Sequence, residues 1–92
     1  MTRILVVDDS LMALTTLEGL LVNHGFEVVT APNGKVALEL LRKDEAIELV
    51  VSDVHMPVMG GIEMAEKIAA SMGERRLKII MLTTEHPHIL RE

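Results

Sequence analysis

The sequence predicts an α/β fold in which a parallel β-sheet carries helices on both of its faces. Short apolar runs rich in β-branched residues alternate with amphipathic segments of helical length along the 92 residues. Each connection between apolar runs is long enough to hold a helix, as parallel strands require. The order is strand-helix-strand-helix-strand-helix-strand, which is typical of a single layered α/β domain.

The first half of the chain contains two of the four expected strands. Ile4 to Val7 is an apolar run that reads as a strand buried on both faces. Ser10 can cap a helix over Leu11 to Asn23, and Gly25 can terminate it. From Phe26 to Ala31, apolar and polar side chains alternate enough to predict a second strand, at an edge of the sheet. The side chains of this helix expected to face the core are Leu14, Leu17, Leu20 and Leu21.

The second half repeats the alternation. Asn33 can cap a helix over Lys35 to Lys43, and the strand Ile47 to Ser52 follows it. A loop with proline and a double glycine leads to a helix over Ile62 to Met72, and the last expected strand is Leu77 to Leu82. The side chains of these two helices expected to face the core are Val36, Ala37, Leu40, Leu41, Ile62, Ala65, Ile68, Ala69 and Met72.

Composition argues against several classes of function. Phe26 is the sole aromatic residue and the net charge is −5, which disfavours nucleic-acid binding by stacking or by phosphate contacts. The absence of cysteine excludes disulfides and thiolate metal sites and fits a reducing compartment. No signal peptide or membrane-spanning apolar run is evident, so we expect a cytoplasmic protein without a membrane partner. Arg75, Arg76 and Lys78 are expected to lie in a solvated turn.

Polar residues follow three of the expected strands: Asp8 and Asp9 the first, Asp53 the third and Thr83 the fourth. Parallel strands end at one edge of the sheet, so the three carboxylates meet if the first and third strands are neighbours. Carboxylates this close raise one another's pKa unless a cation relieves them, and such oxygen donors suit Mg²⁺ or Mn²⁺. Asp53, which stands alone, is the better candidate for a phosphoryl acceptor that forms an acyl phosphate.

Four short segments carry a resemblance to a known family. They are Val6-Val7-Asp8-Asp9-Ser10, Ala31-Pro32-Asn33-Gly34, the stretch from Ser52 to Gly61 with Asp53-x-x-Met56-Pro57-x-Met59-x-Gly61, and Ile80-Met81-Leu82-Thr83. Together the segments resemble the receiver domain of two-component response regulators, the chemotaxis-type phosphoacceptor fold. The resemblance covers the whole chain and implies a flavodoxin-like sheet, with residues 1–92 forming a single, incomplete receiver domain.

The resemblance implies a role for each residue of the predicted site. Asp53 would accept a phosphoryl group from a sensor histidine kinase. Asp8, Asp9 and Asp53, together with the backbone carbonyl of His55, would hold Mg²⁺. The domain would then be a phosphorylation switch and not an enzyme that acts on an external substrate.

Further roles and one departure concern the end of the chain. The resemblance makes Thr83 the switch residue, gives the backbone amide of Thr84 a phosphoryl contact, and assigns His55 and Glu85 to the tuning of dephosphorylation. The family's fifth strand and fifth helix are absent, and with them the lysine that pairs with the phosphoryl group. Lys78 does not replace this lysine, because it lies on the fourth strand five residues before Thr83.

Other interpretations remain open from the sequence. Without a fifth strand the fourth would be an exposed apolar edge, so we expect self-association through that strand or the C-terminal segment. The chain would then be an incomplete receiver that acts as an interaction module with little phosphoryl chemistry. A phosphatase or phosphotransferase with an aspartyl nucleophile is disfavoured by the carboxylate spacing. A dinucleotide-binding domain is disfavoured because no G-x-G-x-x-G follows the first strand.

Overall fold

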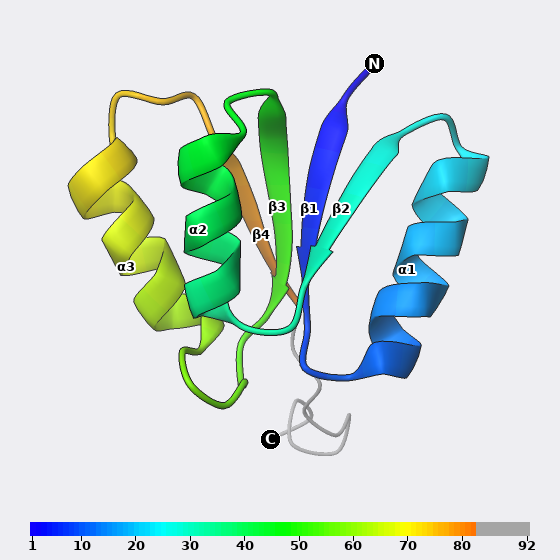
Figure 1. Ribbon diagram of the computed structural model, residues 1–92, viewed down its shortest axis with the longest axis horizontal. Coiled ribbons are helices and arrows are strands. Elements are labelled where there is room, and N and C mark those ends of the chain that lie inside the picture. The colour runs from blue at the N-terminus through cyan, green and yellow to red at the C-terminus, as the bar shows by residue number, and fades with distance from the viewer. Residues whose placement is uncertain (83–92) are drawn as a thin grey trace, which may run out of the picture.

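The computed structural model describes residues 1–82, which form four parallel strands between two layers of helix (Figure 1). Helix α1 covers one face of the sheet, and α2 and α3 cover the other. No helix in this part of the chain is long and apolar enough to cross a membrane. The elements are β1 (Arg3–Val7), α1 (Leu11–Asn23), β2 (Glu27–Ala31), α2 (Gly34–Lys43), β3 (Ile47–Asp53), α3 (Gly61–Met72) and β4 (Lys78–Leu82).

The strand order, β2-β1-β3-β4, makes the first and third strands neighbours. Val7 at the end of β1 is in register with Ala31 of β2 on one side and with Ser52 of β3 on the other. At the end of the last pair, Asp53 is in register with Leu82 of β4. The predicted flavodoxin-like arrangement is therefore confirmed, and β2 lies at an edge as expected. Among the described residues, β4 forms the other edge.

The core lies on both faces of the sheet and is aliphatic. On the α2 and α3 side, the fully buried side chains include Leu5, Val50, Leu41 and Met64. The smaller cluster under α1 consists of Ile4, Val6 and Leu14, with partly buried side chains such as Leu17 and Phe26 packed against it. These branched residues fill both faces of the central strands, which explains the unbroken apolar runs seen in the sequence.

The helical faces were predicted only in part. Leu20 and Ile62 were expected to face the core, but each is 54% exposed. In α3 the buried positions are Gly61, Met64 and Ile68, so the helix is rotated relative to the expected face. In α2 the sequence prediction overlooked Leu38, which is buried. A crossover helix touches the sheet along one stripe, and the direction of its entry loop selects which of several apolar residues lie there.

Arg75 is not the solvated residue that the sequence suggested. Its guanidinium group donates hydrogen bonds to the carbonyl oxygens of Leu41, Asp44 and Ile47. These carbonyls belong to the end of α2 and the start of β3, so one side chain ties the α3–β4 connection to both elements. Asp44 also accepts a 2.7 Å hydrogen bond from Arg3 on β1. The edge of the sheet opposite the carboxylates is thus held by two arginines.

Candidate carboxylate site

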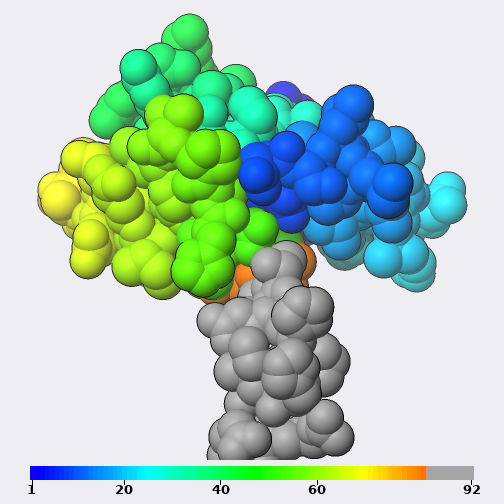
Figure 2. Space-filling view, turned by 90° about the horizontal axis from the view of Figure 1, so that it is seen from below, coloured from blue at the N-terminus to red at the C-terminus, as the bar shows by residue number. Residues whose placement is uncertain are grey.

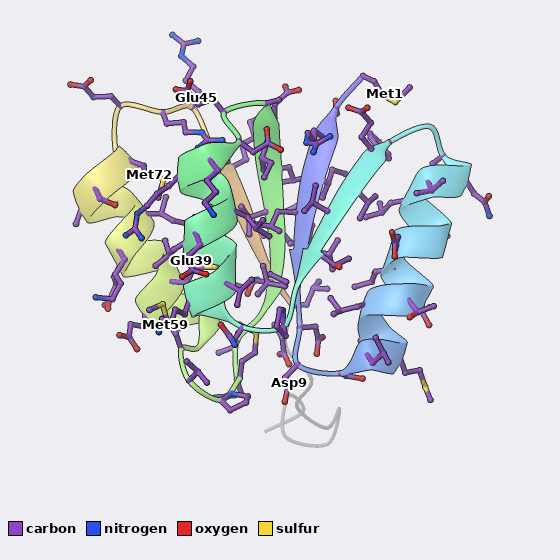
Figure 3. All side chains as sticks on the ribbon, in the orientation of Figure 1. Met1, Asp9, Glu39, Glu45, Met59 and Met72 are labelled. Atoms are coloured by element: carbon purple, nitrogen blue, oxygen red, sulfur yellow. The ribbon has the colours of Figure 1, made fainter. Side chains whose placement is uncertain are left out.

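Three aspartates converge at the carboxyl edge of the sheet, as the strand order requires. One oxygen from each of Asp8, Asp9 and Asp53 lies within 4.8 Å of the others. Asp8 and Asp53 are buried, whereas Asp9 is exposed. Figure 3 shows Asp9 at the end of the sheet where the strands finish, and Figure 2 looks onto that end of the molecule. The sequence prediction that these three carboxylates form one cluster is confirmed.

Backbone amides orient the two buried carboxylates. The Ser10 amide donates to Asp8 Oδ1 at 2.9 Å, and the Val54 amide donates to Asp53 Oδ1 at 2.8 Å. Ser10 is positioned for this because it caps α1, its Oγ accepting a hydrogen bond from the Ala13 amide at 3.2 Å. Each buried carboxylate therefore has one oxygen, Oδ1, that is fixed by a backbone amide.

The negative charges of the three carboxylates repel one another. Burial raises the pKa of Asp8, and the negative charges of Asp53 and Asp9 raise it further, while the hydrogen bond from Ser10 acts in the opposite direction. A divalent cation among the three carboxylates would relieve both the repulsion and the cost of burying charge. The donors are all hard oxygen atoms, which is the chemistry that Mg²⁺ prefers. The residues present therefore fit a Mg²⁺ site.

A closely packed loop connects Asp53 to α3. The Gly61 amide donates to the Val54 carbonyl at 2.9 Å, which closes the loop on itself. The Gly34 amide, at the start of α2, donates to the Met59 carbonyl at 2.9 Å and ties the loop to the neighbouring helix. The outer surface of the loop, including the exposed residue His55, lines an open cavity of about 410 Å³. His55 therefore lies in a closed loop that follows directly on Asp53.

The sequence prediction overlooked two residues that shape the site. The buried Ser52 hydroxyl donates to the Asp53 carbonyl oxygen at 2.8 Å. Gly61 lies so close to the same carbonyl that an added Cβ would collide with it, and this Cβ would lie 3.1 Å from Ser52 Oγ. The double glycine was visible in the sequence, but only the packing shows that a Cβ on either residue would crowd a backbone carbonyl oxygen, that of Asp53 at Gly61 and that of Val54 at Gly60.

Not every predicted site residue lies in the described part of the chain. Thr83, Thr84 and Glu85 lie outside the described residues. Lys78 is the first residue of β4, at the edge of the sheet opposite the carboxylates. The last described residue, Leu82, is the register partner of Asp53.

A parallel sheet with helices on both faces and a carboxylate cluster at its carboxyl edge defines an α/β domain of the flavodoxin-like kind. Comparison with known families makes this more specific. The family described as "Response regulator receiver domain" matches residues 4–91. The chain therefore belongs to the response regulator receiver family.

Solved structures and curated relatives support the same family assignment. The chain is similar to the chemotaxis protein CheY4 of Vibrio cholerae, with a TM-score of 0.85 and 35% identity over 99% of this chain and 76% of that one. It is also similar to the response regulator TrrA of Thermotoga maritima, solved in complex with Mg²⁺ and BeF, with a TM-score of 0.84 and 36% identity over 100% of this chain and 76% of that one. TrrA has also been solved with the histidine kinase ThkA, and in that structure it is 38% identical over 95% of this chain and 73% of that one, with a TM-score of 0.83.

A relative of quite different length is the two-component response regulator ORR23 of rice, Oryza sativa subsp. indica. It is 39% identical over 82 residues, which are 88% of this chain and only 12% of the regulator. The chain therefore spans a small part of that protein, and the similarity concerns the receiver domain alone.

Proposed function

We propose that this domain accepts a phosphoryl group on Asp53 from a sensor histidine kinase, with Mg²⁺ held by Asp8, Asp9, Asp53 and the backbone carbonyl of His55. The observation that carries the proposal is the cluster of three carboxylates, with Asp53 buried at the end of β3 and its Oδ1 held by a backbone amide. The similarity to TrrA, which has been solved with a histidine kinase and with Mg²⁺ and BeF, supports both the donor and the metal.

The chemistry follows from the orientation of the Asp53 carboxylate. The Val54 amide holds Oδ1, so Oδ2 is the oxygen that attacks the phosphorus atom. A new Oδ2–P bond forms as the P–N bond to the kinase histidine breaks, and the imidazole departs with that electron pair. Bound Mg²⁺ would neutralise charge on the phosphoryl oxygens. Asp8, fixed through Oδ1 by Ser10, would contribute its other oxygen to the cation and would otherwise repel the incoming phosphoryl group.

Residues beyond the described part complete the proposal on the strength of the family resemblance alone. Thr83 would act as the hydroxyl switch, the amide of Thr84 would contact the phosphoryl group, and Glu85 together with His55 would tune dephosphorylation. The resemblance also calls for a lysine at the end of a fifth strand, and no lysine follows Lys78 in this chain.

The phosphoacceptor assignment is tested with a small phosphodonor. Incubating the chain with acetyl phosphate and Mg²⁺ is expected to add one phosphoryl group, detected by intact mass spectrometry. Asp53→Asn, which removes the attacking carboxylate, is expected to abolish the adduct, whereas Glu63→Gln on α3 leaves it intact. An adduct that persists in Asp53→Asn would place the acceptor elsewhere. If the wild-type chain forms no adduct, the alternative is favoured, in which the domain is an interaction module with little phosphoryl chemistry.

A second function, self-association, is favoured by β4. Among the described residues this strand lies at the edge of the sheet, and its Ile80 and Leu82 side chains are 48% and 39% exposed. Exposed apolar edge strands pair readily with other chains. We propose that a second copy of the chain is the partner.

Light scattering coupled to size exclusion tests this second proposal. The wild-type chain at micromolar concentration is expected to elute as a dimer, and Ile80→Lys is expected to shift it to the monomer by placing a charge on the edge strand. Met12→Lys, which changes a still more exposed apolar residue on α1, is the control and should remain dimeric. A monomeric wild-type chain contradicts the proposal.

A further inference from the structure

Val58 adopts a backbone conformation that valine rarely tolerates. Its φ is 70°, and it is the one non-glycine residue of the described chain with a positive φ. The Met59 amide donates to the Pro57 carbonyl at 2.8 Å across Val58, which is the hydrogen bond of a γ-turn. A γ-turn with positive φ at its centre is rare and strained, and a β-branched side chain adds to the strain. The Val58 side chain is 75% exposed, so little packing offsets this cost.

The surrounding loop is clamped on both sides of the turn. The bond from Gly61 to the Val54 carbonyl closes the loop, and the bond from Gly34 to the Met59 carbonyl fixes it to α2. The Met59 side chain packs against the main core and fills the space where a Cβ on Gly34 would lie. A strained residue persists only where its neighbours determine the backbone in this way, and such residues cluster at functional sites.

We propose that Val58 is a positioning residue for the metal site: its strained γ-turn holds the Val54–Gly60 loop in the conformation that presents the His55 carbonyl to Mg²⁺. The inference rests on the proposed function, because it assigns the strain a role in binding the cation. His55 lies three residues before Val58 and within the same closed loop. The shape of the turn would then set where the His55 backbone lies relative to Asp53, so that the site is ordered before the cation arrives.

Three substitutions at Val58 distinguish backbone strain at this residue from its role in positioning the metal site. Val58→Asn introduces a side chain that tolerates positive φ, and Val58→Gly removes every side-chain constraint on φ. Val58→Ile retains a β-branched side chain, and with it the strain, and is the matched control. Thermal unfolding is measured in metal-free buffer, and the Mg²⁺ dissociation constant is measured by titration of the same proteins. Neither readout requires phosphorylation.

In metal-free buffer Val58→Asn is expected to raise the unfolding midpoint by about 4–8 °C over Val58→Ile. The unfolding midpoint of Val58→Gly should rise less, because glycine increases the conformational entropy of the unfolded chain. For Mg²⁺, the Asn variant should match wild type, while the flexible Gly variant should bind about tenfold more weakly.

Two results overturn the inference. An Asn variant no more stable than the Ile variant shows that the turn stores no strain, and a Gly variant that binds Mg²⁺ as tightly as wild type shows that the turn does not position the site. A wild-type chain without any Mg²⁺ response refutes the proposed function and with it the positioning role, while the order of unfolding midpoints still decides whether Val58 is strained.

Discussion

Gly61→Ala is expected to lower the free energy of unfolding by about 3 kcal/mol, at the upper end of the usual cost of overpacking. A Cβ at this position would collide with the Asp53 carbonyl oxygen and lie 2.9 Å from Met81 Sδ. The first of these obstacles is backbone, which cannot rotate away. Helix α3 or the end of β3 must therefore shift, and a shift of β3 moves the acceptor carboxylate. Denaturant unfolding monitored by circular dichroism measures the loss.

The chain provides a matched control for this substitution. Gly19 lies within α1, and a Cβ added there meets no atom within 4 Å. Gly19→Ala is therefore expected to stabilise the domain by about 0.5–1 kcal/mol, because alanine is the better helix former. The same chemical change should thus have opposite signs at the two glycines. Equal effects at both positions would contradict the close packing of Gly61 against β3.

Asp8→Asn is expected to abolish stabilisation by Mg²⁺. A cation that binds only the folded chain stabilises the wild type by about 2.7 kcal/mol at a concentration one hundred times its dissociation constant. Asparagine preserves the hydrogen bond from Ser10 but removes one negative charge from the cluster. The Mg²⁺-dependent rise in unfolding midpoint, measured by differential scanning fluorimetry, should therefore be present in wild type and absent in the variant. An equal rise in both proteins would exclude Asp8 as a metal ligand.

Without metal, the thermal stability of Asp8→Asn should differ from that of the wild-type chain, and the size of the difference should depend on pH. The pKa of Asp8 is raised in the folded chain, so this residue contributes most to stability when it is protonated, at a pH below the ordinary pKa of aspartate. That contribution is lost as the pH rises through the raised pKa of the folded state. In metal-free buffer at neutral pH, Asp8→Asn is therefore expected to unfold at a higher temperature than wild type, and the gap should close on acidification.

Short-range patterns in the sequence were sufficient for the order and type of every described element. The helix Leu11–Asn23 was predicted with both of its ends, because Ser10 caps it and Gly25, with a φ of 89°, ends the turn that follows. The convergence of Asp8, Asp9 and Asp53 followed from placing two parallel strands side by side. These features depend on periodicity, on capping chemistry and on the common direction of the strands, all of which a sequence displays.

The features that the sequence did not reveal depend on contacts between distant segments. Ile62 and Met64 are equally plausible core residues of α3, and only the entry of the helix from the clamped loop buries Met64. Arg75 resembles any charged residue in a turn until the carbonyls of Leu41 and Ile47 are placed around it. The positive φ of Val58 has no local signal either, because residues that favour this conformation are usually glycine or asparagine.

A crystal structure of the chain grown with Mg²⁺ and fluoroberyllate, which stands in for the phosphoryl group, tests the central claim most directly. The account predicts beryllium bonded to Asp53 Oδ2 and a metal ion contacted by Asp8, Asp9 and the His55 carbonyl oxygen. Fluoroberyllate bound at another carboxylate, or a metal ion that leaves Asp8 and Asp9 without contact, would contradict it.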